Sequence, residues 1–224
     1  METVIVEIRS AEGGEDAKLL VEDQYGIYVR MLARRGFSSE ILESSSGLIS
    51  FRAEGPGVVA AFQHEPGGHR FQRIPPTEKR GRVQTSTITV AVLHEPEATA
   101  FYLNPADLDW KTARGSGPGG QNRNKTESCV IVTHKPTGTV VRIDTERSQH
   151  RNRELALGIL RARLREVQQK AQMGAANDAR KAQLGSGMRG DKVVTVRYQD
   201  DQVTYHLLNR KLRLSDYLKG NWEI

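Results

Sequence analysis

A glycine-rich segment at residues 114–126 is the part of the sequence whose composition most directly suggests chemistry. Four of the six residues 115–120 are glycine, which permits backbone angles that other residues avoid and lets the chain approach a ligand closely. Gln121 follows the last glycine. Three cations flank the segment, namely Arg114, Arg123 and Lys125. A glycine tip that carries one amide side chain between cations predicts a loop that reaches into RNA.

The surrounding residues exclude other chemistries that use glycine loops or polar triads. The spacing Gly115-x-Gly117-x-x-Gly120 formally matches a dinucleotide-binding fingerprint, but no apolar strand precedes it and no amphipathic helix follows it. A Walker loop would need Lys and then Ser or Thr where Gln121 and Asn122 stand. No Ser-His-Asp set is evident, the six histidines have no metal-ligand spacing, and a single cysteine excludes an intramolecular disulfide. We therefore expect no metal and no cofactor.

The distribution of charge along the chain favours a nucleic acid as partner. Residues 111–189 carry 16 basic and 6 acidic side chains, whereas residues 1–66 carry 6 basic and 11 acidic ones. A strongly basic block beside an acidic one is typical of nucleic-acid binding. A solvated basic helix is the alternative, and it would explain residues 151–181 but not the basic loop before them. No stretch approaches the ~18 apolar residues that span a bilayer and no signal peptide opens the chain, so we expect a cytoplasmic protein with no membrane partner.

The hydrophobic pattern predicts an α+β protein with more than one domain. In the first unit a helix is expected from Ala17 onward, with the acids Glu15 and Asp16 at its start, where the helix dipole favours them. Alternating or apolar runs predict strands there at Thr3–Arg9, Leu48–Ala53, Gly57–Phe62 and Ser86–Leu93, with turns at residues 55–57 and 66–68.

A second unit is expected to start near Pro105. A long helix is predicted from about Arg153 to about Lys181, with an apolar face made by Leu160, Leu164 and Val167. The remaining predicted strands are Cys129–His134 and Thr139–Asp144 in this unit, then Val193–Arg197 and Val203–Leu207 after the helix. Cys129 is interpreted as a core strand residue.

The run Ser116-Gly117-Pro118-Gly119-Gly120-Gln121-Asn122 resembles the catalytic loop of class I peptide release factors and related ribosome-rescue hydrolases. The resemblance continues through residues 144–152 and into the helix that follows. Residues 7–15 and 67–78 look like the codon-recognition domain of that family, and residues 185–218 are similar to its last domain. Within the codon domain, Pro75-Pro76-Thr77 matches the Pro-x-Thr tripeptide of bacterial factors that read UAA and UAG, whereas the UGA-reading type has Ser-Pro-Phe there.

This resemblance implies a fold and a set of domain boundaries. Residues 1–100 would form an α/β sandwich-like codon-recognition domain. Residues 101–183 would form the peptidyl-tRNA hydrolysis domain, with a small sheet and the long helix. Residues 184–224 would pack back on the first domain. The family's N-terminal helical domain has no counterpart in this chain, so we expect either a naturally minimal protein or a shortened form, with no support for partners that dock on that domain.

The resemblance also implies how the glycine tip would act. Gly119 and Gly120 would allow the conformation that inserts Gln121 beside the ester joining peptide to tRNA. The Gln121 backbone N–H would donate a hydrogen bond at the reacting centre, and its side chain would shape a pocket that admits only water. Ribosomal RNA would supply the rest of the site, so the activity would belong to the protein and the ribosome together. Gln121 is N5-methylated in the family, which implies a glutamine methyltransferase as partner.

Codon contacts follow from the same resemblance. Gly13 and Asp16 would contact the first uridine, Thr77 and Gln72 would act around the second and third bases, and Thr85 would act at the third. Two residues depart from the family pattern, because Gln84 stands where a base-stacking histidine is usual and Asp16 replaces a glutamate. Each residue also has a structural interpretation: Asp16 as a charge at a helix start, Gln72 and Thr85 as surface strand residues, and Pro75-Pro76 as a turn.

Phosphate contacts with ribosomal RNA are expected from six basic residues, Arg114, Arg123, Lys125, Arg147, Arg151 and Arg153. We therefore expect the partners to be rRNA, an mRNA stop codon and peptidyl-tRNA, bound by a monomer. Three functions compete: release at UAA and UAG, rescue of stalled or damaged ribosomes, and competitive ribosome binding without hydrolysis. The intact Gly-Gly-Gln tip disfavours the third, and the non-basic C-terminal residues disfavour a codon-independent rescue enzyme.

Overall fold

The computed structural model describes residues 1–94, 102–115, 126–184 and 190–222. The chain divides into two compact units, one made of Met1–Pro96 with Ala176–Ile224 and the other of Glu97–Ala175. The first unit is therefore discontinuous in sequence, and the last turns of the long helix belong to it. Among the described residues, no helix combines the length and the apolar character needed to cross a membrane.

The first unit is built on an eight-stranded sheet with the order β11-β10-β9-β4-β5-β1-β3-β2. Its strands are β1 Glu2–Ser10, β2 Ser38–Ser45, β3 Leu48–Gly55, β4 Gly67–Arg73, β5 Gln84–His94, β9 Val194–Arg197, β10 Gln202–Tyr205 and β11 Arg210–Arg213. Neighbouring strands are antiparallel except β4 and β9, which pair in parallel with Gln72 opposite Arg197. The C-terminal strands thus extend the N-terminal sheet, which confirms the expected packing of this segment on the first unit.

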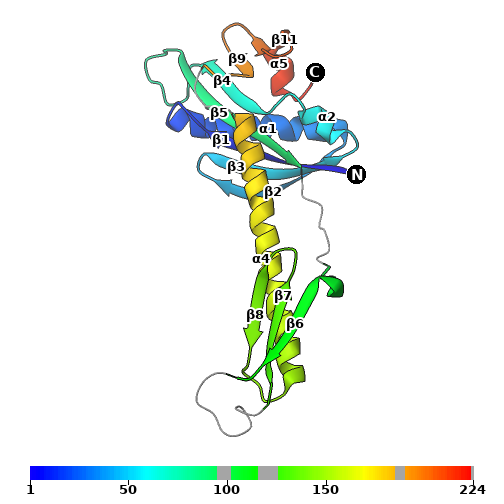
Figure 1. Ribbon diagram of the computed structural model, residues 1–224. Coiled ribbons are helices and arrows are strands. Elements are labelled where there is room, and N and C mark those ends of the chain that lie inside the picture. Colours follow the sequence, from blue (N-terminus) through cyan, green and yellow to red (C-terminus); the bar gives the residue numbers. More distant parts are fainter. Residues whose placement is uncertain (95–101, 116–125, 185–189, 223–224) are drawn as a thin grey trace. The chain divides into compact units, whose positions relative to one another are not determined.

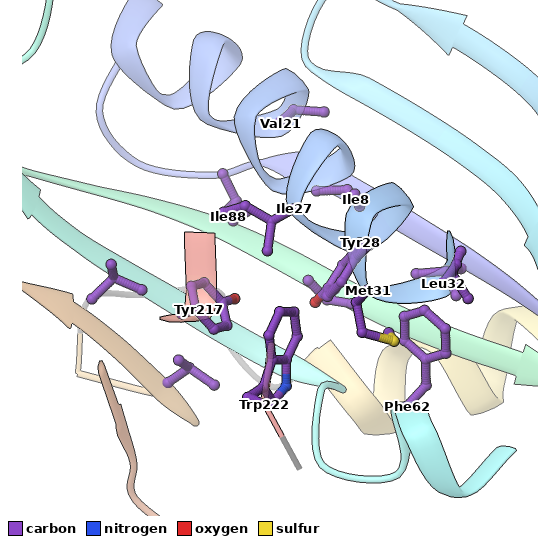
Figure 2. Packing of buried hydrophobic residues seen from close by; sticks show 14 of the residues in the cluster. Ile8, Val21, Ile27, Tyr28, Met31, Leu32, Phe62, Ile88, Tyr217 and Trp222 are labelled. Atoms are coloured by element: carbon purple, nitrogen blue, oxygen red, sulfur yellow. The ribbon is translucent and has the colours of Figure 1, made fainter. Parts of the chain in front are cut away.

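Helix α1, Glu15–Arg35, covers one face of this sheet (Figure 1). The alternation in β1 points Val4, Val6 and Ile8 toward the helix, where each is fully buried. The short helix α5, Leu214–Leu218, and the residues after it close the same core. Tyr217 and Trp222 stack with ring centroids 4.5 Å apart, beside side chains of α1 (Figure 2).

A buried carboxylate ties three segments of this core together. Glu65 is fully buried and accepts hydrogen bonds from Tyr28 Oη at 2.6 Å and Tyr205 Oη at 2.7 Å. His69 lies beside it and donates from Nε2 to the Glu65 backbone oxygen at 2.8 Å, while its Nδ1 is buried with no hydrogen-bond partner in the described part of the chain. Helix α1, the approach to β4 and strand β10 are therefore linked through one side chain.

Two predictions for the first unit are wrong. Gly57–Phe62 is not a strand, because Val58–Phe62 forms the short helix α2 after Gly57 adopts a left-handed conformation with φ 84°. A strand would bury Ala60 with Val58 and Phe62, whereas the helix buries only the latter two. The turn expected at residues 66–68 is instead the beginning of β4.

The second unit pairs a three-stranded antiparallel sheet, in the order β6-β7-β8, with the helix α4. Its elements are a 3₁₀ turn η1 at Pro105–Asp107, β6 Leu108–Ala113, β7 Cys129–His134, β8 Thr139–Ile143 and, as far as Ala175, the helix α4 Gln149–Leu184. Leu160 and Leu164 are buried against the sheet as expected, and Cys129 is fully buried in its strand. Val167 is 51% exposed, so the apolar face predicted to include it ends one turn earlier.

Candidate functional site

The loop between β1 and α1 is hydrogen-bonded to the beginning of β5. The Ala11 N–H donates to the Thr87 oxygen at 3.0 Å, and the Thr87 N–H donates to the Glu12 oxygen at 2.7 Å. Gly13 has φ 133° and lies directly against Ser86, where any side chain at position 13 would overlap it. The exposed glycine tip is therefore held at the point where β5 begins.

Just beyond this tip, α1 is joined to the end of β4 by a buried ion pair. Arg73 donates to Asp16 Oδ1 from Nη2 at 2.7 Å and from Nε at 3.1 Å. It also donates to Asp23 Oδ2 at 2.7 Å, and its guanidinium lies 6.0 Å from the centroid of the Tyr198 ring. Burial alone would lower the pKa of Arg73, but the bonds to Asp16 and Asp23 raise it overall.

Because of this ion pair, the Asp16 side chain lies in the protein interior, against Arg73. Its side chain is 3% exposed, and Oδ2 is buried with no hydrogen-bond partner in the described segments. Asp16 thus occupies the first turn of α1, where the helix dipole favours an acid, and it also anchors Arg73. Sequence reasoning missed Arg73, although it shares the core-facing phase of β4 with Phe71 and so requires a buried acid as partner.

The Pro75-Pro76-Thr77 tripeptide lies in the loop that joins β4 to β5. Pro75 is buried, whereas Pro76 and Thr77 are exposed. Glu78 fixes this loop, because its N–H donates to the Pro75 oxygen at 3.0 Å and its carboxylate accepts from the Arg80 N–H at 2.7 Å.

Two side chains complete the contacts of Glu78. Its Oε2 accepts from Gln84 Nε2 at 2.5 Å and from Arg82 Nη2 at 3.1 Å. The backbone bond from Arg80, together with these two partners, lowers the pKa of Glu78 below its ordinary value. The Gln84 side-chain amide nitrogen is therefore already hydrogen-bonded inside the loop. The position of Gln84 before Thr85 in the sequence did not indicate this bond to Glu78.

Gln72 and Thr85 are directly opposite each other in the β4–β5 pair. The Gln72 side-chain oxygen accepts from Arg197 Nε at 3.1 Å, and its backbone oxygen accepts from the Tyr198 N–H at 3.0 Å. The hydrogen bond from Arg197 of β9 to Gln72 was not predicted, because no motif near Arg197 indicates that it lies beside Gln72.

The eight residues predicted to contact the codon are accordingly gathered at one end of the larger sheet. The β1–α1 loop supplies Gly13, the first turn of α1 supplies Asp16, and the β4–β5 hairpin supplies the others, namely Gln72, Pro75, Pro76, Thr77, Gln84 and Thr85. The predicted catalytic residues Gly119, Gly120 and Gln121 lie outside the described residues, as do Arg123 and Lys125.

In the second unit, hydrogen bonds from α4 hold the residues that directly follow the glycine-rich segment. Asn152 in α4 is fully buried and donates to the backbone oxygens of Ser128 at 2.8 Å and Glu146 at 2.9 Å. Gln149 donates to the Glu127 oxygen at 3.1 Å. The chain leaving the segment is thereby joined to the first turn of α4.

Four of the predicted phosphate-binding residues are described, and all are exposed: Arg114, Arg147, Arg151 and Arg153. The Arg153 guanidinium lies 4.3 Å from the centroid of the Trp110 ring, a cation–π contact that holds the side chain against β6. The arrangement provides a cationic surface near the first turns of α4.

Comparisons with known proteins match two family domains along the chain. The PCRF domain matches residues 1–90, and the RF-1 domain matches residues 96–207. Peptide chain release factor 1 of Anaeromyxobacter dehalogenans is 42% identical over 212 residues, covering 92% of this chain and 57% of the relative. Peptide chain release factor 1 of Mycoplasma pneumoniae is 44% identical over 208 residues, covering 91% of this chain and 58% of the relative.

A solved structure, RF2 of Thermus thermophilus, aligns with a TM-score of 0.56 and 30% identity over 98% of this chain and 65% of its own length. The chain therefore belongs to the class I peptide chain release factor family. The first curated relatives that it matches are named peptide chain release factor 1, and it spans 57–62% of their length.

Proposed function

We propose that this protein terminates translation: it recognises UAA and UAG in the ribosomal A site and triggers hydrolysis of peptidyl-tRNA. The observation that carries the proposal is the gathering of Gly13, Gln72, Thr85 and the Pro75-Pro76-Thr77 loop at one end of the sheet. This occurs in a chain about 42% identical to proteins named peptide chain release factor 1.

At the codon end, unpaired bases are recognised by hydrogen bonds to their edges. Gly13 at the tip of the β1–α1 loop meets the first uridine through its backbone, with Asp16 behind it. Thr77 and Gln72 act around the second and third bases, and Thr85 acts at the third. The ion pair of Arg73 with Asp16 supports this assignment of residues to the three bases, because it fixes the distance between the start of α1 and the β4–β5 hairpin.

At the catalytic end, ester hydrolysis needs a positioned water and a donor to the developing negative charge. Gly119 and Gly120 give the backbone freedom to place Gln121 at the ester. The Gln121 N–H donates the hydrogen bond, and its side chain excludes nucleophiles larger than water. Ribosomal RNA completes the site, so the isolated protein is not a self-sufficient hydrolase. A glutamine methyltransferase modifies Gln121, a step that mass spectrometry of the cellular protein tests directly.

Phosphate contacts by Arg114, Arg123, Lys125, Arg147, Arg151 and Arg153 position the second unit on ribosomal RNA. The exposure of the four described residues supports this role. The protein acts as a monomer in the cytoplasm. Its affinity for ribosomes falls steeply as salt rises, because each phosphate contact releases condensed counterions. An affinity that is flat between low and high salt would contradict this assignment.

The test is peptide release from ribosomes that carry formyl-Met-tRNA, programmed separately with UAA, UAG, UGA and a sense codon. Fast release on UAA and UAG alone is expected. Equal release on all four codons contradicts codon recognition, and no release on any codon, with binding intact, contradicts hydrolysis.

Rescue of stalled or damaged ribosomes is the second candidate, and a specific observation favours it. Gln84 stands in place of a base-stacking histidine. Its amide nitrogen donates a hydrogen bond to Glu78, and its side chain has no aromatic face. This arrangement is suited to a looser codon preference. Release that requires a truncated mRNA or a cleaved ribosomal RNA, and is slow on intact UAA complexes, would establish rescue instead.

A further inference from the structure

The face of the larger sheet opposite α1 is rich in cations near the codon end. In β4, β9 and β10 the core-facing side chains include Phe71, Val196 and Val203, so the intervening residues point to the other face. The cations on that face are Arg70, Arg197, Lys211 and Arg213, while Lys192 lies before β9, beside the start of β4.

Arg70 is a partly buried cation of this face whose charge is not balanced by an acidic partner among the described residues. Its Nε is buried without a hydrogen-bond partner, and no ion pair of Arg70 is found in the described part of the chain. Burial and the nearby positive charge of Arg197 lower the pKa of Arg70. Arg70 and Arg197 lie on the same face of neighbouring strands, two positions apart in the β4–β9 register, and their like charges repel.

Little negative charge offsets this pair. The Asp200 carboxylate lies 3.7 Å from Arg197 Nη1, but the two side chains are 57% and 43% exposed, and such surface pairs are weak. His206 lies in the same surroundings. Burial, followed by the charges of Lys192, Arg70 and Arg197, lowers its pKa. The surface around Arg70 and Arg197 is therefore set up to receive an anion.

The position of this cationic surface indicates which anion it receives. Arg197 donates to the side-chain oxygen of Gln72, and Arg70 lies two residues before Gln72 on the same side of β4. Gln72 in turn faces Thr85 across the hairpin. A base held by Gln72 and Thr85 brings its own backbone phosphate within reach of both arginines. Arginine suits this task because its planar fork matches phosphate oxygens.

We propose that Arg70 and Arg197 form a phosphate-binding site for the mRNA backbone beside the third base of the codon. The proposal rests on the function proposed above, since it takes the β4–β5 hairpin to lie on the codon. It assigns binding to residues outside the basic segments of the second unit. It also gives Arg197 a double role, because the same side chain orients Gln72 and neutralises the phosphate.

A double-mutant cycle between protein and mRNA tests the contact. The variants are Arg70→Gln, Arg197→Gln and the charge-retaining Arg70→Lys. The matched control is Arg210→Gln, an exposed cation whose register partner is the core-facing Tyr205, so that it lies on the other side of the sheet. The mRNAs carry one uncharged methylphosphonate linkage on the 5′ side, on the 3′ side, or one linkage beyond the 3′ side of the third codon base. Binding to programmed ribosomes is measured by fluorescence titration from low to high salt.

We expect Arg70→Gln and Arg197→Gln each to weaken binding about tenfold at low salt, as for the loss of a charge-assisted hydrogen bond. The slope of log affinity against log salt should fall by about 0.7 for each variant, the value for one single-strand phosphate. One methylphosphonate mRNA should weaken the wild type similarly and should not weaken the glutamine variants further. Arg70→Lys should retain the salt slope, and Arg210→Gln should behave as wild type.

Three results would overturn the proposal. Unchanged affinity and salt slope in both glutamine variants would remove the site. A salt slope that falls in the variants while every methylphosphonate mRNA binds normally would assign the arginines to ribosomal RNA. Altered codon preference with an unchanged salt slope would reduce Arg197 to a positioning residue for Gln72. Because binding is measured, these outcomes remain distinct from a failure of the wild type to release peptide, which would refute the proposed function alone.

Discussion

The buried ion pair at the codon end makes a quantitative prediction about stability. In Arg73→Met the long apolar stem is kept, but the Asp16 carboxylate, 3% exposed, loses its only cationic partner among the described residues. Breaking a buried pair from one side typically costs about 3–5 kcal/mol. Asp23→Asn removes a partner that is 48% exposed, and the loss of such a surface pair costs about 0–1 kcal/mol.

The assay is equilibrium unfolding in urea at pH 7, followed by the fluorescence of Trp222, which is 6% exposed in the core of the first unit. A Trp110→Phe background leaves Trp222 as the only tryptophan of the chain, so the signal reports the unfolding of this unit. The double variant Asp16→Leu with Arg73→Met removes both charges, and we expect it to recover most of the loss in free energy of unfolding.

Two results would refute this reasoning. If Asp23→Asn destabilises the unit as much as Arg73→Met, burial does not set the strength of these pairs. If the double variant is no more stable than Arg73→Met, the loss came from packing of the arginine stem and not from an unpaired carboxylate.

Three further predictions concern catalysis, pH and codon choice. Gln121→Pro, which deletes the backbone donor, should slow peptide release about 10²–10³-fold, and Gln121→Ala should slow it much less; equal rates in single-turnover release assays would contradict a backbone role. Burial lowers the pKa of His69 below its ordinary value of 6.5, so the unfolded chain takes up the proton first as the pH falls. The free energy of unfolding should therefore decrease as the pH falls below about 6.5, and His69→Gln should flatten this dependence in urea titrations at pH 5 and pH 7. Gln84→His restores an aromatic face, worth about tenfold in base stacking, and should increase the preference for UAA over a sense codon in release assays; an unchanged preference would show that position 84 does not contact the codon.

The sequence was most informative where local pattern and motif coincide. The alternation of Val4, Val6 and Ile8 located β1, and the Pro75-Pro76-Thr77 tripeptide marked the loop between β4 and β5 as a candidate codon contact. The α+β class followed from the hydrophobic pattern and the attachment of the C-terminal segment to the first unit followed from the resemblance, and both are confirmed.

Other features could not be predicted because their signals are weak or distant. Every residue of β2 is exposed, so this edge strand buries nothing that would produce a pattern. Gly67 and Gly68 suggest a turn, yet Gly68 is required in β4 because its Cα lies against the Asp191 backbone oxygen. Residues 58–62 were too short a run for a helix to be distinguished from a strand by apolar content alone.

The end of the larger sheet that we propose to bind the codon is assembled from segments more than a hundred residues apart, which changes the effect expected of a substitution there. Gln72 accepts a hydrogen bond from Arg197, and Arg73 lies against Tyr198, so both faces of the last residues of β4 are positioned by the end of β9 and the residue after it. Glu65 reinforces the same junction, because its carboxylate joins Tyr28 of α1 to Tyr205 of β10. Under the function proposed above, a change in β10 should alter codon affinity through the orientation of Gln72, and a change at Arg197 should act both through Gln72 and through the proposed phosphate contact. A change in the second unit should leave that orientation intact, because its core around Leu160 is separate. Under the proposed function, codon recognition and hydrolysis should therefore be separable by substitutions in the first and in the second unit.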